Sequence, residues 1–588
     1  MLRTRTAVAI LCALILGALV APASGAAKPV EVGRILHAQL VTSDSVASAA
    51  ARKHRRKAKK RRLVLQRTLI PHHERYVKFK RRAARHVRRV KRARSPVFGR
   101  ISANAIGLNQ PGLVFSDTPV AWRSAPANAT GAVGPNNYVE MTNSAVKVFK
   151  KSDLTLDSGA GKLGSMAMND FVGASNREVT YPQIQWDPVT QRWYYLALYV
   201  EENKDASHPG KDALAFGWSK TSDPNVPPSG SNSATGWCRY IVDTGVSFDD
   251  FPKLGNNDTR LIVGANSFAD NDPSSDFQTA HVFTISKPTA GTGCSTNPEL
   301  KQFGTAASPL PMKNGAEATT PVPVYIPQSS ANGYVLAADD PGTHASLKGT
   351  RIMEWHVDPT GNLHDDTSSN GLFPVADYQW PGAAAQGGSS NWIDTLDARL
   401  TQAVGVTDPT SGVGALALWT QHTILSGASG AQVRWYELVP SQCNRTGASL
   451  CTGGVRQTGN QTPPASTWYF NGAVTPTLNG DQAVLIYNSA GNATTTTRST
   501  VKADSRISTD AVGTMPGTEQ TVVTSGDSVE DSSCGVGAGD PCAWGYYAGA
   551  APDTSVGSAN KVWASNMYTA ARNGTTPAWV TRNFSFTP

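Results

Sequence analysis

The sequence predicts an all-β fold, namely a seven-bladed β-propeller, with six or eight blades as alternatives. It also predicts a basic N-terminal arm that is disordered or helical. Three observations lead to this prediction. A unit of one polar turn and two strands recurs about every 70 residues. The strands show period-two alternation or short apolar runs. The positive charge is concentrated in one segment before the first repeat.

The recurring turns are rich in Asp, Asn, Gly and Pro, the residues that tight turns favour. They lie at 134–137, 187–190, 256–258, 328–333, 408–410, 479–481 and 552–554. Copies of one unit predict a closed ring in which each blade is buried between two neighbours. The strands after Gly134 and the terminal strands near 579–586 are expected to complete one blade jointly. Two tandem β-sandwiches are the rival arrangement.

Residues 1–26 have the features of a secretory signal peptide: early arginines, an apolar stretch and small residues at its end. A membrane anchor is the alternative. The cysteines that follow are six in number, as expected in an oxidising compartment. Two pairs share a spacing of eight residues, so we predict Cys443–Cys451 and Cys534–Cys542, which leaves Cys238–Cys294. The protein is expected to be secreted or extracellular, with cell-surface association as an alternative.

The charge divides the chain into a basic arm, 27–100, and an acidic body, 115–588. Of the 54 Lys and Arg residues, 22 lie between 51 and 100, beside one acid, Glu74. The remainder holds 32 basic and 43 acidic residues. The run 52–62 cannot pack a core alone and is expected to be disordered. Near 72–94, apolar residues recur at helical spacing among arginines, which predicts a basic amphipathic helix.

The arm has three interpretations. It is a propeptide or spacer, a tether to an anionic envelope polymer or membrane surface, or, less favoured, a nucleic-acid-binding segment. Export removes the usual nucleic-acid target, and no aromatic platform for stacking bases is found in the arm.

Several stretches resemble the secreted bacterial β-propeller proteins that are distantly sialidase-like in fold and mostly without an assigned activity. These are Thr130–Glu140, Trp186–Trp193, Asp250–Gly255, Arg434–Leu438 and Gly517–Val523. The resemblance extends over about 115–588 and implies a secreted propeller rather than a particular activity. Related sequences tend to carry an acid after Trp-Gly in the last blade, whereas this chain has Tyr546 after Gly545.

Ligands of propellers usually bind at the channel mouth, near the residues that precede each innermost strand. The candidates there are Arg177, Glu178, Asp249, Asp250, Lys253, Glu317, Asp397, Arg399, Asn471, Trp544 and Tyr546. A sialidase-like site would use arginines to hold a carboxylate, with Tyr546 and Glu317 as a nucleophile pair. No cofactor and no metal site are predicted. A structural cation such as calcium at Asp249 and Asp250 is an alternative to an ordinary turn.

The sequence favours a secreted, non-catalytic propeller that binds an envelope polymer, a glycan or a protein partner, and a monomer is expected. The alternative is a sialidase-like glycoside hydrolase that acts at the central channel. No nucleophile elbow and no phosphate-binding glycine loop is present in the sequence, so neither a serine hydrolase nor a nucleotide enzyme is favoured.

Overall fold

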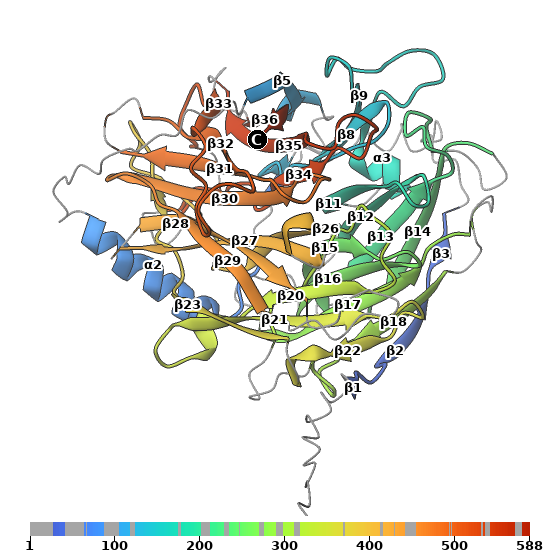
Figure 1. Ribbon diagram of the computed structural model, residues 1–588, viewed down its shortest axis with the longest axis horizontal. Coiled ribbons are helices and arrows are strands. Elements are labelled where there is room, and N and C mark those ends of the chain that lie inside the picture. The colour runs from blue at the N-terminus through green and yellow to red at the C-terminus, as the bar shows by residue number, and fades with distance from the viewer. Residues whose placement is uncertain are drawn as a thin grey trace, which may run out of the picture.

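Seven antiparallel sheets follow one another along the chain and form the blades of a β-propeller (Figure 1). The prediction of seven blades is confirmed, and the sandwich alternative is excluded. The computed structural model describes residues 28–41, 64–65, 68–87, 105–117, 124–174, 178–200, 212–228, 234–245, 247–269, 276–289, 294, 298–310, 318–368, 371–411, 415–427, 430–440, 454–492, 494, 497–530, 533–535, 541–570 and 579–588.

The blades are numbered here from the N-terminus, and each begins with its innermost strand. Blade 1 contains β7 (Thr130–Val133), β8 (Asn137–Met141), β9 (Ala145–Lys150) and β10 (Ser165–Ala167). Blade 2 contains β11 (Glu178–Asp187), β12 (Arg192–Val200), β13 (Asp212–Ser219) and β14 (Trp237–Asp243). Blade 3 contains β15 (Phe248–Asn256), β16 (Arg260–Phe268), β17 (Phe277–Ser286) and β18 (Glu299–Phe303). Blade 4 contains β19 (Val322–Pro323), β20 (Gly333–Ala338), β21 (Gly349–Val357), β22 (Leu363–Asp365) and β23 (Leu372–Tyr378).

The remaining blades come from the C-terminal half. Blade 5 contains β26 (Leu400–Thr407), β27 (Leu416–Ser426), β28 (Gly430–Val439) and β29 (Gly454–Gln461). Blade 6 contains β30 (Thr467–Pro476), β31 (Ala483–Gly491), β32 (Thr500–Arg506) and β33 (Gln520–Thr524). Blade 7 contains β34 (Gly549–Pro552), β35 (Val562–Thr569) and β36 (Trp579–Thr587).

An early strand closes the ring. β5 (Ala105–Val114) pairs with β36 and becomes the outer strand of blade 7, and the two lie side by side in Figure 1. The expectation that the strands after Gly134 share a blade with the C-terminal strands is therefore wrong, because β7 and β8 belong to blade 1. The pairing of β5 with β36 joins the start of the body to its C-terminal strand by an antiparallel ladder of hydrogen bonds within blade 7.

Residues of the predicted arm also join the blades. β1 (Lys28–Pro29) pairs with β22, β2 (Arg34–His37) with β18, and β3 (Gln39–Leu40) with β14. Each short strand covers the outer edge of one blade, where unpaired backbone groups would otherwise face solvent. This placement differs from the expectation of an arm separate from the body.

The smaller elements connect or cover the blades. They are α2 (His73–Val87), α3 (Met168–Val172), β4 (Val64–Leu65) paired with β6 (Ser124–Ala125), β24 (Ala384–Ala385) paired with β25 (Trp392–Ile393), and the 3-10 turns η1 (Phe115–Asp117), η3 (Pro341–Thr343), η4 (Asp366–Ser368) and η5 (Pro409–Ser411). Among the described residues, no helix has the length and apolar content needed to cross a membrane.

The predicted turns form at one end of the inner strands, and their Asp and Asn side chains hold them closed. Asp187 accepts hydrogen bonds from the amide of Val189 at 2.9 Å and from the hydroxyl of Thr190 at 2.7 Å. Asp408, Asp553 and Asn257 accept the amide two residues later in the same way. The recurring polar residues are therefore Asx turns, repeated from blade to blade.

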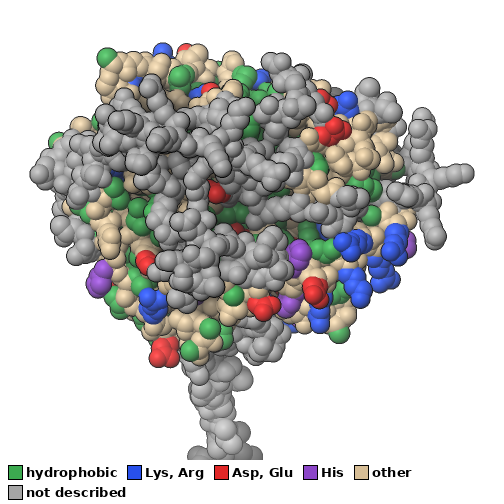
Figure 2. All heavy atoms as spheres, turned by 180° about the vertical axis from the view of Figure 1, so that it is seen from behind, with side chains coloured by type: hydrophobic (Ala, Val, Ile, Leu, Met, Phe, Trp, Pro, Cys, Tyr) green, Lys and Arg blue, Asp and Glu red, His purple; other side chains and the backbone are tan. Residues whose placement is uncertain are grey.

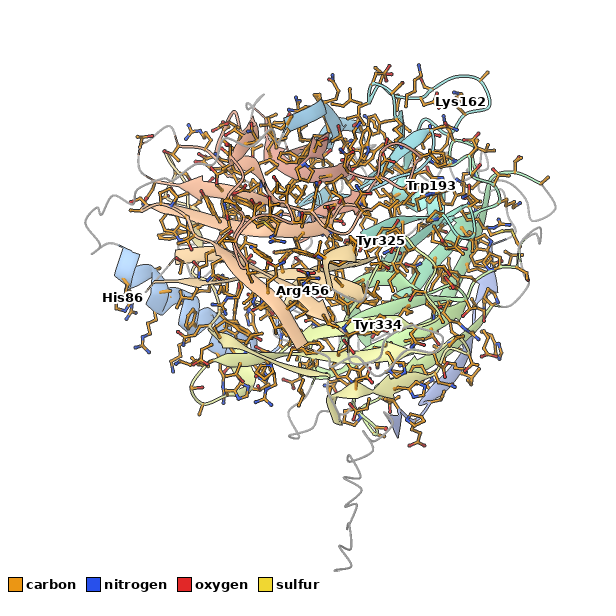
Figure 3. The ribbon with its side chains drawn as sticks, viewed as in Figure 1. His86, Lys162, Trp193, Tyr325, Tyr334 and Arg456 are labelled. Atoms are coloured by element: carbon orange, nitrogen blue, oxygen red, sulfur yellow. A yellow bond between two sulfur atoms is a disulfide. The ribbon has the colours of Figure 1, made fainter. Side chains whose placement is uncertain are left out.

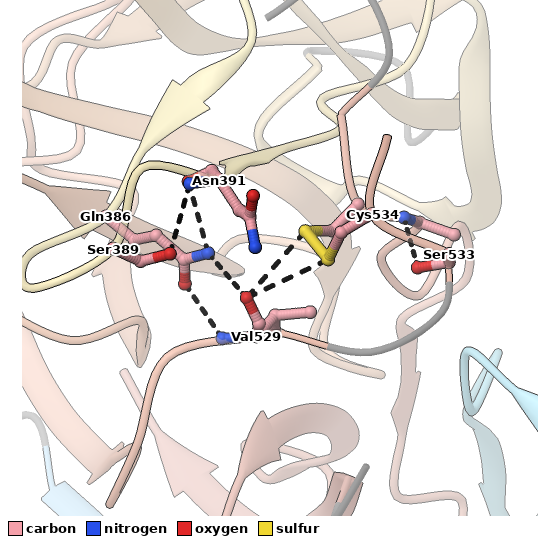
Figure 4. Close-up of a disulfide and its surroundings, with 8 residues drawn as sticks. Gln386, Ser389, Asn391, Val529, Ser533 and Cys534 are labelled. Atoms are coloured by element: carbon pink, nitrogen blue, oxygen red, sulfur yellow. Dashed lines mark hydrogen bonds between the residues drawn. A yellow bond between two sulfur atoms is a disulfide. The ribbon is translucent and has the colours of Figure 1, made fainter. Parts of the chain in front are cut away.

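Two disulfides are formed among the described residues, and both were predicted. Cys238–Cys294 joins β14 to the segment before β18, and Cys534–Cys542 closes a loop before blade 7. Figure 4 shows the second, beside Val529, whose carbonyl accepts from Gln386 at 2.8 Å and whose amide donates back to it at 2.9 Å. Cys443–Cys451 lies outside the described residues. Disulfides are usual in proteins of oxidising compartments, which is consistent with an extracellular protein.

Candidate functional site

The inner strands begin around one end of the central channel, and an irregularity recurs there. A non-glycine residue with positive φ stands just before the inner strand or within its first half in blades 1 to 6: Asn128, Tyr181, Phe251, Thr320, Ala398 and Asn471. Side chains rarely adopt this conformation, and bulges of this kind redirect the neighbouring side chains. The repeated bulge gathers residues from different blades at this end of the channel, which we call the mouth.

Below the mouth, the channel narrows to a small cavity of about 40 Å³ between the inner strands. Side chains of one blade donate there to main-chain carbonyls of another blade. Gln185 donates to the carbonyl of Leu254 at 2.6 Å, and Gln402 to that of Ala550 at 2.5 Å. Tyr325, which Figure 3 labels near the centre of the ring, donates its hydroxyl to the carbonyl of Trp186 at 2.6 Å. These contacts hold the blades together.

Three aromatic rings from blades 2, 3 and 7 form the floor of the mouth. The ring of Phe251 lies 5.0 Å from that of Tyr547 and 6.4 Å from that of Tyr181. Lys253 places its Nζ 3.2 Å from the centre of the Tyr547 ring and 4.4 Å from that of Phe251. Burial lowers the pKa of Lys253 well below its usual value, and the charge of Arg399 lowers it further.

A buried guanidinium surrounded by carboxyls lies above this floor. Arg399 donates to both oxygens of Asp397, from Nε at 2.6 Å and from Nη2 at 2.7 Å. Its guanidinium carbon lies 4.6 Å from the centre of the Phe251 ring. Burial opposes the charge of Arg399, but Asp397, Asp250 and Asp340 together raise its pKa above the usual value, so the guanidinium is a fixed cation.

Two further carboxyls interact electrostatically with Arg399. Burial raises the pKa of Asp250 to about 7 against the opposing effect of Arg399. Burial also raises the pKa of Asp340 to about 7, and the charge of Asp397 adds to the increase. Both groups therefore change protonation near neutral pH, whereas an ordinary Asp is fully ionised there. Such carboxyls can accept a hydrogen bond, donate one, or transfer a proton to a bound molecule.

The N-terminal segment occupies this mouth. The amide of Leu69 donates to Asp250 Oδ2 at 2.8 Å, and the carbonyl of Leu69 accepts from Arg399 Nη2 at 2.9 Å. The hydroxyl of Thr68 donates to that of Tyr181 at 3.2 Å. Leu69 and Ile70 are buried in the same apolar cluster as Tyr181 and Phe251. A polypeptide main chain is thus bound by its donor and its acceptor at once.

Two charged atoms at the mouth remain unsatisfied. Asp250 Oδ1 and Arg399 Nη1 are buried and have no hydrogen-bond partner among the residues that the structure describes. Buried polar groups are nearly always paired, and leaving one unpaired costs about 1–3 kcal/mol. The mouth therefore offers one more acceptor and one more donor than residues 68–70 use.

The structure brings five of the predicted candidates together at the mouth: Asp250, Lys253, Asp397, Arg399 and Tyr546. The last of these interacts electrostatically with Tyr181. Glu178 is half-buried at the start of β11. Arg177 and Glu317 lie outside the described residues, so the proposed nucleophile pair cannot be placed.

Three candidates make structural contacts instead. Asp249 binds His281 Nδ1 at 2.7 Å within blade 3, and Trp544 donates to Asn488 Oδ1 at 3.1 Å between blades 7 and 6. Asn471 binds Asn488 at 2.9 Å and Asn566 at 3.0 Å. Among the described residues, no three His, Cys, Asp or Glu side chains gather as metal ligands would.

Sequence reasoning missed several residues of the mouth: Tyr181, Phe251, Asp340, Tyr547 and the covering segment 68–80. Tyr181 and Phe251 share the bulge position with Ala398 and Asn471, so aligning the repeats blade by blade would have singled them out. Asp340 follows the second strand of its blade rather than preceding the first. The covering segment carries no repeat at all.

Comparisons with known proteins leave the activity open. No family profile and no curated protein matches the chain. Among solved structures, it is similar to a Hadza microbial sialidase at 10% identity and TM-score 0.30, over 62% of this chain and 65% of the sialidase. The chain thus spans just under two thirds of that protein.

Two further structures are similar at the same level. A Bacillus subtilis arabinanase has 10% identity and TM-score 0.23, over 53% of this chain and 94% of its own. A variant levansucrase of B. megaterium has 11% identity and TM-score 0.28, over 63% and 93%. At such scores these similarities carry no argument about activity.

Proposed function

We propose that the chain is a secreted, non-catalytic β-propeller that binds a cell-envelope polymer, a glycan or a protein partner at the mouth of its channel. The observation that supports this proposal is the unpartnered pair Asp250 Oδ1 and Arg399 Nη1 above an aromatic floor. A ligand that supplies one donor and one acceptor would satisfy both atoms. Vicinal hydroxyls of a sugar and the main chain of a peptide both have this chemistry, and either would also pack on Phe251 and Tyr547.

The arrangement of the charges favours binding over catalysis. Arg399 is committed to Asp397 through two hydrogen bonds, which makes it rigid. Lys253 is held between aromatic rings and makes no ion pair among those the structure describes. A sialidase-like site requires several arginines close together. Among the described residues of the blades, Arg399 is the arginine that we find at the mouth.

A glycoside hydrolase is the second candidate, and one observation supports it. Asp250 and Asp340 have a pKa of about 7, so each would hold its proton near neutral pH as a general acid must. Glycoside hydrolysis uses two carboxyls on either side of the scissile bond. Two titrating carboxyls beside a guanidinium are compatible with that chemistry.

Ligand binding and glycoside hydrolysis can be distinguished in a variant whose mouth is not covered by residues 68–70. Leu69→Glu places a carboxylate in the apolar cluster that buries the Leu69 side chain and should displace the segment from the mouth. We expect this variant to bind ligands on a glycan and peptide array, and to lose that binding at least 10-fold when Arg399→Ala is added. Turnover of fluorogenic glycosides that is abolished by Asp250→Asn or Asp340→Asn would instead establish the hydrolase. Identical array profiles with and without Arg399→Ala would contradict binding at the mouth.

We also propose that the outer face of α2 binds an anionic envelope polymer. Arg81, Arg82 and Arg85 are exposed along this helix, and Lys and Arg side chains gather on one side of the molecule in Figure 2, where α2 lies after the turn from Figure 1. A groove of about 970 Å³ runs between the helix and residues 344–347. Charge complementarity with polyphosphate-like or uronate-like chains supports this partner.

This second contact has its own test. Arg81→Glu with Arg85→Glu should weaken binding to immobilised polyphosphate at least 10-fold in low salt, and the loss should shrink as salt rises. The matched control is Lys150→Glu with Lys162→Glu; Lys162 lies at the opposite side of the molecule from His86 of α2 (Figure 3). Equal losses in both pairs would mean that net charge, rather than α2, governs binding. Retention on phosphatidylglycerol vesicles but not on polyphosphate would identify a membrane surface instead.

A further inference from the structure

Residues 68–70 fill the mouth in the manner of a ligand. Their main chain uses one oxygen of Asp250 and one nitrogen of Arg399, and their side chains are buried. Leu69 is 4% exposed and Ile70 6% exposed. A short, largely apolar segment is therefore recognised through both its main chain and its side chains, as in other grooves that bind peptides.

The helix that follows anchors this segment against the link between blades 4 and 5. The hydroxyl of Tyr76 donates to Asp394 Oδ1 at 2.8 Å, and Lys80 Nζ donates to Thr395 Oγ1 at 2.6 Å and to the carbonyl of Leu396 at 3.1 Å. The rings of Tyr76 and Phe79 each meet Trp380 edge-on at 5.8 Å. Arg75 of α2 also donates to the carbonyl of Gly342 at 2.7 Å, whereas Arg81, Arg82 and Arg85 remain exposed. One face of α2 is thus specific for this surface.

The ring of blades closes without a strand from this segment. Its closure comes from β5 and β36, and residues 68–87 contribute no strand to any blade. The two-residue pairing of β4 with β6 is the sheet contact nearest to the segment. The segment also matches its site incompletely, because Asp250 Oδ1 and Arg399 Nη1 stay unpartnered beneath it.

The buried Lys80 is a further sign of a contact that can be released. Its side chain is fully buried, and its Nζ lies 3.8 Å from Asp394, beyond hydrogen-bond distance. Burial lowers the pKa of Lys80 to about 8, although Asp394 opposes this change. Burying an ammonium group without a close counter-ion costs free energy that leaving the surface would recover.

We propose that residues 68–87 are an exchangeable internal ligand, and that the mouth is a binding site for a short apolar segment followed by a basic helix. This inference rests on the proposed function, because the external ligand and the segment would occupy the same mouth. While the segment is in place, Asp250, Arg399 and the aromatic floor are covered. Release of the segment therefore gives the external ligand access.

The sequence on both sides of the segment suggests how release occurs. Basic runs lie at 52–62 and at 88–94, and both are substrates for proteases that cleave after Lys or Arg. The strands β1 to β3 hold the chain before the first run, and β5 holds the chain after the second. A single cut would leave the segment tethered at an effective concentration of about a millimolar, so both cuts are needed for release.

The test uses the folded full chain with a viral protease recognition sequence inserted after Val46, after Pro96, or at both places. A fluorescent peptide of residues 64–87 is the probe. After both cuts, gel filtration removes the released segment. We expect the probe to bind this material at one site per chain, as measured by a rise in its fluorescence anisotropy. The uncut and singly cut chains should bind it at least 10-fold less. A segment that elutes with the body after both cuts, and does not exchange with the probe overnight, would overturn the proposal.

A matched pair of probe peptides shows whether the observed contacts govern the exchange. Lys80→Glu places a negative charge beside Asp394, whereas Lys78→Glu makes the same charge change at an exposed position of α2. The first should weaken binding to the doubly cut chain at least 10-fold, and the second by less than twofold. Equal effects would overturn the proposed docking.

The same material distinguishes the two proposals. If the probe exchanges but the opened chain binds nothing on the array, the internal ligand stands and the proposed function fails. If array ligands bind the uncut chain as well as the opened chain, the function stands and the internal ligand fails.

Discussion

The two ends of the inner strands differ in how their polar groups are satisfied. At the turn end, Asp187 closes its own turn and binds Lys287 of the next blade at 2.7 Å. At the mouth, Asp250 and Arg399 keep unpartnered atoms, and the neighbouring backbone holds Phe251 at positive φ. The same strands therefore end in a stable framework on one side and in a strained, incompletely paired site on the other. Strain and unpaired charge of this kind gather where proteins bind or react.

The largest expected effect comes from breaking the framework at Asp187. Its carboxylate and the Lys287 ammonium are each 2% exposed, so Asp187→Ala leaves a buried cation without its partner. We expect a loss of about 3–5 kcal/mol in the free energy of unfolding, measured by urea denaturation. Asp153 forms the same kind of turn with Thr155 at the surface. Asp153→Ala should therefore change the midpoint little, and equal losses would contradict the role of the buried pair.

The two disulfides should differ in a smaller but measurable way. Cys238–Cys294 closes a loop of 56 residues and Cys534–Cys542 one of 8. From loop entropy alone, replacing each pair by Ser should cost about 4 and about 2.5 kcal/mol. Thermal unfolding of the two double variants tests this order. The reverse order would show that local packing around Val529, rather than chain entropy, sets the contribution of the shorter loop.

The last effect concerns the mouth and appears as a pH dependence. Because the pKa of Asp340 is raised to about 7, the folded chain keeps a proton between about pH 4 and about pH 7 that the unfolded chain releases. The free energy of unfolding therefore falls as pH rises through this window. Asp340→Asn should remove about 2–4 kcal/mol of that fall. Urea titrations at the two limits, with exposed Asp377→Asn as the control, measure it, and unchanged slopes would contradict the assignment.

The framework could be predicted from the sequence because it is repeated. Each Asp or Asn turn recurs with its strands, and seven copies leave little choice but a ring. The order of the strands within the ring was harder to predict from the sequence. β5 lies upstream of the first repeat, and its place in blade 7 is known from its pairing with β36. Cysteine spacing sufficed for the two disulfides that the structure describes.

The mouth could be predicted only in part. Asp250, Lys253, Asp397 and Arg399 lie beside inner strands, so their place in the repeat made them candidates. Asp340 comes from another position of its blade, and its electrostatic interaction with Arg399 depends on how the ring brings blades 4 and 5 together. Chain distance hides such contacts: Leu69 and Arg399 are 330 positions apart.

The basic arm, too, could be predicted only in part. Apolar spacing near 72–94 predicts a helix, and α2 spans His73–Val87 within it. The buried face combines Tyr76 and Ala83 with Lys80, a residue that charge patterning assigns to solvent. The acceptors that bury Lys80 belong to Thr395 and Leu396, which the sequence of the arm cannot reveal.

The central claim is that the chain fills its own mouth with residues 68–80. Hydrogen–deuterium exchange of the full chain tests it most directly, because the amide of Leu69 is hydrogen-bonded to Asp250 only in this arrangement. We predict that peptides from residues 68–80 are protected to nearly the same degree as β15, and that Arg399→Ala weakens their protection and leaves that of β36 unchanged. Exchange of residues 68–80 at the rate of an unstructured chain would contradict the account.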